Sequence, residues 1–115
     1  MSKIRIMRLN SEIQKALSEM LVGEIKDPRL DAMITVTKVA TDEDLKNAKV
    51  WLSVYPNDAE TKQNNLAAVV ASSGFLRSGL ARRLPNIRQT PALKFFLDES
   101  LDYGEKINKM LDDLK

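Results

Sequence analysis

The sequence predicts an α+β domain in which one three-stranded sheet is covered on one face by helices. Near the N-terminus, apolar residues recur every three or four positions, which is the period of an amphipathic helix. Two later segments alternate apolar and polar residues, which is the period of a half-buried strand. The expected order is helix, strand, strand, helix, helix, strand and a short last helix, and a single sheet with helices on one side buries these apolar faces together.

The first element is predicted to be a long helix over residues 5–26. Its apolar positions recur at spacings of three and four: Ile6, Leu9, Ile13, Ala16, Leu17, Met20, Leu21 and Ile25. Its charged positions alternate in sign, as a solvated helix face usually does: Arg8, Glu12, Lys15 and Glu19. Pro28 disfavours helical geometry at Asp27, so we expect the helix to stop there.

Two strands are predicted next, over residues 34–39 and 48–55, joined by a polar hairpin loop over residues 41–47. The second strand alternates cleanly, with one set of residues expected on the buried face: Ala48, Val50, Leu52 and Val54. The first strand is rich in β-branched residues, but its alternation is imperfect. Which of its faces is buried therefore stays open.

Two helices are predicted after Pro56. Asn57 is expected to cap the first, which extends to about Ala71, and the second covers residues 75–84. A third strand follows over residues 93–97. Its alternation places three residues on one side: Leu93, Phe95 and Leu97. Four apolar residues at helical spacing predict the last helix: Ile107, Met110, Leu111 and Leu114.

Residues 72–74 separate the two central helices and are expected to form a kink. Gly74 would supply the backbone freedom, including positive φ, that other residues lack, and would allow another chain to come close. A Gly74→Val substitution is therefore expected to damage function more than its cost in stability suggests. The following helix would also present unpaired N–H groups to a nearby anion.

Composition narrows the function classes. The 115 residues fit a single domain over residues 1–115, and the longest apolar run, residues 66–71, is far too short to span a bilayer. Without cysteine or histidine the chain cannot build a common zinc site, a thiol nucleophile or an imidazole base. We therefore expect a protein that is not an enzyme and uses no cofactor. The absence of cysteine fits the cytoplasm.

Charge is sorted along the chain although the net charge is only +2. Residues 61–97 contain no acidic residue and six basic ones: Lys62, Arg77, Arg82, Arg83, Arg88 and Lys94. Residues 98–115 are net acidic. Such asymmetry favours a polyanionic partner, and RNA is the first candidate.

Four segments, in this order and spacing, resemble the bacterial ribosome-binding factor A family: residues 24–30, 48–50, 73–77 and 90–100. The resemblance implies a type II KH-like domain that binds free small (30S) ribosomal subunits and their 16S rRNA during late maturation and rRNA processing. It further implies a monomer whose release is aided by an assembly GTPase. In that family an Ala-x-Gly kink joins the two central helices, and here Ser72 stands in place of the alanine.

Ten residues are the candidate RNA contacts: Lys3, Arg5, Arg8, Ser72, Ser73, Gly74, Arg77, Arg82, Arg83 and Arg88. Arginine suits phosphate because its planar fork donates paired, charge-assisted hydrogen bonds. At about 100° per residue, however, Arg77 falls near the apolar side of its helix, so a structural role is an equal alternative. For the other cations the alternative is a solvated surface or a frayed terminus.

The competing hypothesis is a protein-interaction module that uses the uncovered sheet face, where Trp51, Tyr55 and Phe96 are expected. Stacking of these rings on bases is a weaker alternative. A nuclease that uses carboxylates and a metal is the third hypothesis, and no convergent acidic cluster supports it. The glycines of residues 74–79 have phosphate-loop spacing, but the required lysine is missing after them.

Overall fold

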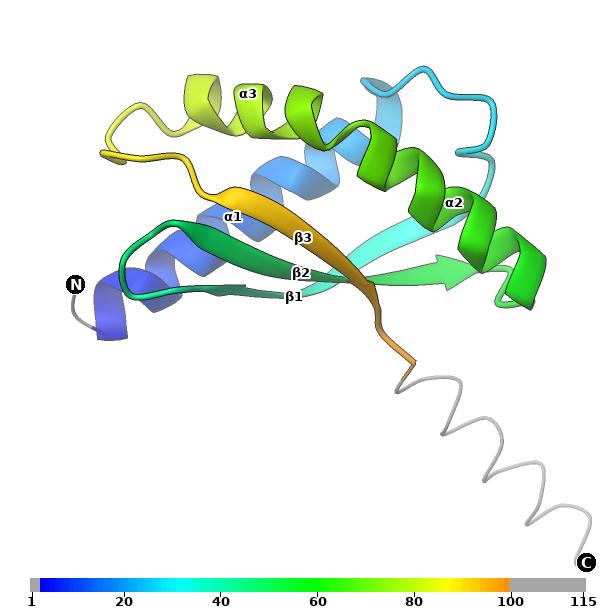
Figure 1. Cartoon of the computed structure of the whole chain (residues 1–115), viewed down its shortest axis with the longest axis horizontal. Helices are drawn as coiled ribbons and strands as arrows, with labels where there is room; N and C mark the ends of the chain where they lie inside the picture. Colours follow the sequence, from blue (N-terminus) through cyan, green and yellow to red (C-terminus); the bar gives the residue numbers. More distant parts are fainter. Residues whose placement is uncertain (1–2, 100–115) are drawn as a thin grey trace, which may run out of the picture.

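The computed structural model describes residues 3–99, which form three helices on one face of a three-stranded sheet (Figure 1). The elements are α1 Lys3–Gly23, β1 Met33–Thr41, β2 Asn47–Tyr55, α2 Ala59–Ala71, α3 Ser73–Arg83 and β3 Ala92–Leu97. The predicted α+β order is thereby confirmed for these residues. The predicted last helix lies outside the described residues.

The sheet has the order β1-β2-β3, with β2 in the centre. β1 and β2 form an antiparallel hairpin, whereas β2 and β3 are parallel. A parallel pair needs a long crossover connection, and α2 with α3 supplies it. Because α1 packs on the same side as this crossover, all three helices cover one face and leave the other uncovered (Figure 1).

The core lies between the sheet and the helix layer. The predicted buried face of β2 is confirmed, since Ala48, Val50 and Leu52 are fully buried and Val54 nearly so. The helices oppose them with fully buried apolar side chains: Ile13, Leu17, Met20, Val69, Leu76 and Leu80. Leu93 and Phe95 of β3 also pack against this cluster, as their alternation predicted.

A β-bulge in β1 explains the imperfect alternation of this strand. Val36 pairs with Leu52 and Lys38 with Trp51, so Thr37 is the extra residue. The side-chain amide of Gln14 in α1 donates to the carbonyl oxygen of Val36 over 2.8 Å at this position. The bulge therefore also provides a hydrogen bond between α1 and the sheet.

α1 ends at Gly23, three residues before the predicted end. Glycine costs about 1 kcal/mol relative to alanine inside a helix, which favours an end at this position. A turn follows, in which Arg29 donates to both carboxylate oxygens of Asp27, over 3.2 and 2.8 Å. These side-chain bonds, with one from the Arg29 backbone, lower the pKa of Asp27, and the same pairing raises the pKa of Arg29.

The N-cap of α2 is Asp58, and the prediction of Asn57 is wrong. Asp58 has extended backbone geometry (φ −68°, ψ 153°), and its carboxylate accepts hydrogen bonds from the backbone N–H and the hydroxyl of Thr61, over 3.0 and 2.8 Å. These two bonds, with the backbone one first, hold the pKa of Asp58 below its usual value.

The kink between α2 and α3 occurs at Ser72, and Gly74 does not form it. Ser72 adopts φ −95° and ψ 8°, while Gly74 already lies inside α3 without positive φ. A side chain at Gly74 would meet open space. The expectation that Gly74 supplies positive φ is therefore wrong, and with it the reason for expecting a special effect of Gly74→Val.

The glycine with the closest surroundings is Gly79, where α3 crosses α1. A Cβ atom added to Gly79 would overlap the sulfur of Met20 and lie 3.3 Å from its terminal methyl. Met20 is fully buried, so its side chain has no solvent to move into. A side chain at position 79 would therefore force the end of Met20 to repack within the core.

We predict that Gly79→Ala lowers the free energy of unfolding by about 1–3 kcal/mol, because the added methyl overpacks the core at Met20. Gly74→Ala is the matched control in the same helix, and its better helix propensity should leave stability unchanged or raise it by up to about 1 kcal/mol. Urea unfolding of both variants measures the difference. Equal stability of the two variants would contradict the close contact.

We predict that Asp58→Asn makes stability less sensitive to acid. A carboxylate with a lowered pKa stabilises the fold above its unfolded pKa of 3.8, and this contribution is lost as the pH falls through the lower folded value. Asparagine caps the helix without titrating. Thermal melts between about pH 5 and pH 2 should show a shallower decline for the variant, with a residual decline from Asp27. An unchanged slope would show that the cap carries no proton linkage.

Candidate nucleic-acid interface

Arg77 fastens α3 to the segment that leads into β3. Its Nε and Nη2 atoms donate to the carbonyl oxygen of Thr90 over 3.2 and 2.8 Å. The next residue, Pro91, is fully buried. Two donors of the Arg77 fork are therefore used inside the molecule, which gives this residue a structural contact.

Arg83 connects the end of α3 to the end of α1. Its Nη1 atom lies 3.5 Å from a carboxylate oxygen of Glu19, and its Nη2 atom is paired with Glu24. The positive charge of Arg83 is thus balanced by two carboxylates. Such exposed pairs contribute little to stability, but they hold the guanidinium toward α1.

Arg82 and Arg88 differ from these two arginines. Both side chains are exposed, and neither guanidinium group forms a hydrogen bond or an ion pair with any residue between 3 and 99. Arg82 also lies in the last turn of α3, where the helix dipole favours a cation. Their guanidinium groups can bind an external phosphate without first breaking an internal contact.

The fold brings Arg5 and Arg88 together although they are far apart in the sequence. Both line a hollow between the start of α1, the β1–β2 loop and the α3–β3 loop. Glu43 and Asp44 line the same hollow. The electrostatic potential of the hollow is therefore mixed in sign.

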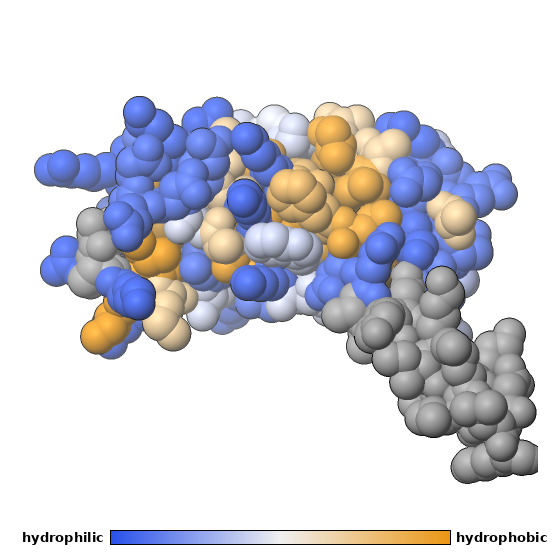
Figure 2. Space-filling view, turned by 60° about the horizontal axis from the view of Figure 1, so that its bottom comes forward, coloured by the Kyte–Doolittle hydropathy of each residue, from blue (hydrophilic) through white to orange (hydrophobic). Residues whose placement is uncertain are grey.

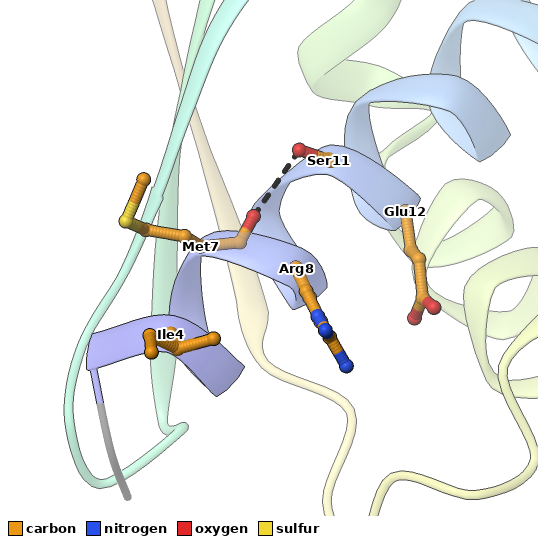
Figure 3. Close-up of a pocket in the computed structure, with 5 residues that line it drawn as sticks. All are labelled: Ile4, Met7, Arg8, Ser11 and Glu12. Carbon is orange, nitrogen blue, oxygen red and sulfur yellow. Dashed lines mark hydrogen bonds between the residues drawn. The ribbon is translucent and has the colours of Figure 1, made fainter.

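Arg8 lies on the outer face of α1, in a shallow hollow that also contains Ile4, Met7 and Ser11 (Figure 3). Its side chain extends to the same side as that of Glu12, one turn further along the helix (Figure 3). Ile4 and Met7 are about two-thirds exposed. Lys3 is exposed in the first turn of α1.

The remaining predicted residues, Ser72 to Gly74, lie at the α2–α3 junction. Ser72 and Ser73 are half-buried, Gly74 is exposed, and no side chain caps the start of α3. The junction therefore offers small residues and backbone atoms to a neighbouring chain. The ten predicted residues do not form one cluster, since they are distributed between this junction, the end of α3 and the start of α1.

Among residues 3–99, no group of three or more carboxylates is arranged to hold a metal ion. In the same part of the chain, no helix has the length and apolar character needed to cross a membrane.

The sequence prediction missed two features that shape this part of the molecule. Asn65 is fully buried, accepts from the backbone N–H of Ala32 over 3.2 Å and donates to Asp31 over 3.1 Å, so it holds the α1–β1 segment against α2. Three lysines share the uncovered sheet face: Lys38, Lys49 and Lys94. The alternation of Lys49 with the buried residues of β2 was the signal for the second feature.

Helix order, sheet order and kink together define a type II KH-like domain, and among residues 3–99 the side chains of Arg82 and Arg88 have no internal partner. The family model of ribosome-binding factor A matches residues 5–111. Ribosome-binding factor A of Clostridium beijerinckii is 40% identical over 111 residues, which cover 96% of this chain and 93% of the relative. The chain belongs to the ribosome-binding factor A family.

A crystal structure and a fitted homology model agree with this assignment. The crystal structure of ribosome-binding factor A from Thermus thermophilus is 25% identical, with a TM-score of 0.70 and coverage of 83% of this chain and 97% of that chain. A model of the Thermus thermophilus factor fitted into a cryo-electron microscopy map of a 30S complex is 26% identical, with a TM-score of 0.65 and coverage of 80% and 93%.

We predict that Arg77→Ala loosens the segment before β3, because Thr90 loses a two-pronged donor worth about 1 kcal/mol. The backbone N–H of Ala92, which donates to Lys46 over 2.9 Å, should exchange with solvent about fivefold faster. Arg82→Ala removes the same kind of side chain without an internal contact and is the control. Equal exchange in both variants would contradict the structural role of Arg77.

Proposed function

We propose that this chain binds the free small (30S) ribosomal subunit and its 16S rRNA during late maturation. The observation that carries the proposal is the likeness to the Thermus thermophilus factor fitted into a 30S complex. Family membership over nearly the whole chain supports it. The acid-free stretch of residues 61–97, which contains Arg82 and Arg88, supplies the chemistry.

The two arginines that have no internal partner within residues 3–99, Arg82 and Arg88, are the primary phosphate contacts in this proposal. Three cations at the start of α1 extend the contact: Lys3, Arg5 and Arg8. A-form RNA presents phosphates and 2′-hydroxyls more readily than base edges, so the recognition is directed at shape. Ser72, Ser73 and Gly74 let the backbone come close to the RNA at the kink.

Arg77 and Arg83 act as positioning residues in this proposal. Their internal bonds to Thr90, Glu19 and Glu24 hold α3 and the following loop in place. That placement in turn orients Arg82 and Arg88. The bound factor then holds rRNA segments in one geometry until maturation and rRNA processing proceed, with no catalytic step and no cofactor.

The same proposal includes a single domain over residues 1–115 that acts as a monomer in the cytoplasm. Release from the mature particle is assigned to an assembly GTPase. The proposal assigns no described surface of this chain to that GTPase. The GTPase competes with this chain for the particle and does not need a dedicated site on this chain.

Co-sedimentation with free small subunits and with whole ribosomes tests the proposal. We expect a preference for free small subunits, with binding that weakens at least about tenfold between roughly 50 and 200 mM salt. The double variant Arg82→Glu/Arg88→Glu should bind about tenfold more weakly or worse, because it places negative charge against phosphate. A flat salt response would count against the proposal.

The control is Lys15→Glu/Lys26→Glu, which changes the net charge by the same amount at two other exposed positions. Its binding should remain within a few-fold of the unmodified chain. If both double variants lose binding equally, net charge and not the end of α3 determines association, and the assignment of Arg82 and Arg88 is wrong.

A further inference from the structure

The uncovered face of the sheet has an ordered arrangement of rings and cations. Across the three strands, Lys38, Trp51 and Phe96 occupy one row, and Lys49 and Lys94 are neighbours in the next. Figure 2 turns the underside of the sheet toward the viewer and shows apolar and weakly polar side chains gathered in the middle, with hydrophilic ones on both sides.

The aromatic row is held together by direct contacts. The ring centroids of Trp51 and Phe96 lie 5.7 Å apart at an interplanar angle of 30°, so the two rings are stacked. The ammonium group of Lys38 lies 5.1 Å from the centroid of the Trp51 ring. Phe96 keeps 41% of its surface exposed, and Tyr55 at the far end of β2 keeps 69%. Ring surface is therefore available to a ligand.

Within the three strands the charge of this face has one sign, and one carboxylate, that of Asp98 directly after β3, lies beside it. The three strands contain three lysines and no acidic residue, and all three lysines lie on the uncovered face. Asp98, which follows β3, accepts a hydrogen bond from the hydroxyl of Thr37 over 2.6 Å. A strand rise of about 3.3 Å places the lysine row roughly 7 Å from the aromatic row. One nucleotide can therefore place its base at the aromatic row and its phosphate at the lysine row.

We propose that this face binds single-stranded RNA, with bases stacked on Phe96 and Tyr55 and phosphates at Lys49 and Lys94. Aromatic side chains stack on any base, and basic residues beside them follow the backbone of a single strand. A protein partner fits less well, because lysine is depleted from protein–protein interfaces. The inference deepens the proposed function and rests on it, since it gives the same RNA partner a second surface.

The experiment uses the full chain and a 12-nucleotide oligouridylate. Trp51 is the only tryptophan of the sequence, so its fluorescence reports this face alone. We expect saturable quenching of the emission, with an affinity that falls with salt at a logarithmic slope of about −2 for three lysines. A duplex RNA of the same length should quench much less, because its bases are not free to stack.

Substitutions separate this face from the end of α3. Tyr55→Ala and Lys49→Ala/Lys94→Ala should each weaken oligonucleotide binding about tenfold, with unchanged circular dichroism. Lys15→Ala/Lys26→Ala removes the same charge elsewhere and should change nothing. Arg82→Glu/Arg88→Glu should keep oligonucleotide binding while it loses subunit binding. The two proposals can therefore fail separately.

Absence of quenching overturns the inference, and so does quenching that persists unchanged in Lys49→Ala/Lys94→Ala. If the oligonucleotide leaves the emission unchanged while Tyr55→Ala lowers co-sedimentation with small subunits, the face contacts a ribosomal protein and the RNA assignment is wrong. If Arg82→Glu/Arg88→Glu binds subunits normally and the oligonucleotide still quenches, the sheet face stands and the role of α3 fails.

Discussion

The close contact between the Met20 side chain of α1 and the backbone at Gly79 of α3 lies at the point where these two helices pack against each other. Because no side chain separates the helices there, the end of α3 comes near enough to α1 for Arg83 to pair with Glu19. The same placement lets Arg77 reach Thr90 and hold the loop before β3. An apolar contact in the core therefore contributes to the position of α3 and of Arg82, whose side chain has no partner among residues 3–99.

The uncovered sheet face depends on a second local constraint, the bulge at Thr37. With regular alternation after the buried Val36, residue 38 would face the core and residue 39 would face outward. The extra residue reverses this order, so Val39 is buried and Lys38 lies over the ring of Trp51. One inserted residue thus keeps an ammonium group out of the core and adds it to the aromatic row.

The elements that were predicted correctly are those in which the pattern of apolar and polar residues repeats over many positions. The alternation in β2 and the helical period of α1 each involve several residues, so one exception does not change the result. The errors concern single positions. Asn57 and Asp58 are both good caps, and only the backbone geometry selects Asp58. Ser72 accommodates the kink without positive φ, so the glycine two residues later was a misleading signal.

The arginines show that local sequence also limits the prediction of the candidate site. Arg77, Arg82 and Arg83 belong to one short basic segment, yet their environments differ because their partners come from distant segments. Arg83 pairs with Glu19 of α1 and with Glu24 just after it, which lie 64 and 59 positions away in the chain. No local pattern contains such contacts. Composition could therefore indicate a polyanion partner, but only the fold separates cations with internal partners from those without.

The difference between cations with and without internal partners also changes the interpretation of residues 61–97, which contain no acidic residue. The basic residues between 61 and 97 do not produce one electropositive surface, because Lys94 lies on the uncovered sheet face, Arg82 at the end of α3 and Arg88 in the loop between α3 and β3. Under the two proposals, a folded RNA element contacts one side and a single strand contacts the other. Under both proposals, a domain with this layout can hold two rRNA segments at a fixed distance from each other. That is a physical way for an RNA-binding domain to delay one RNA geometry in favour of another.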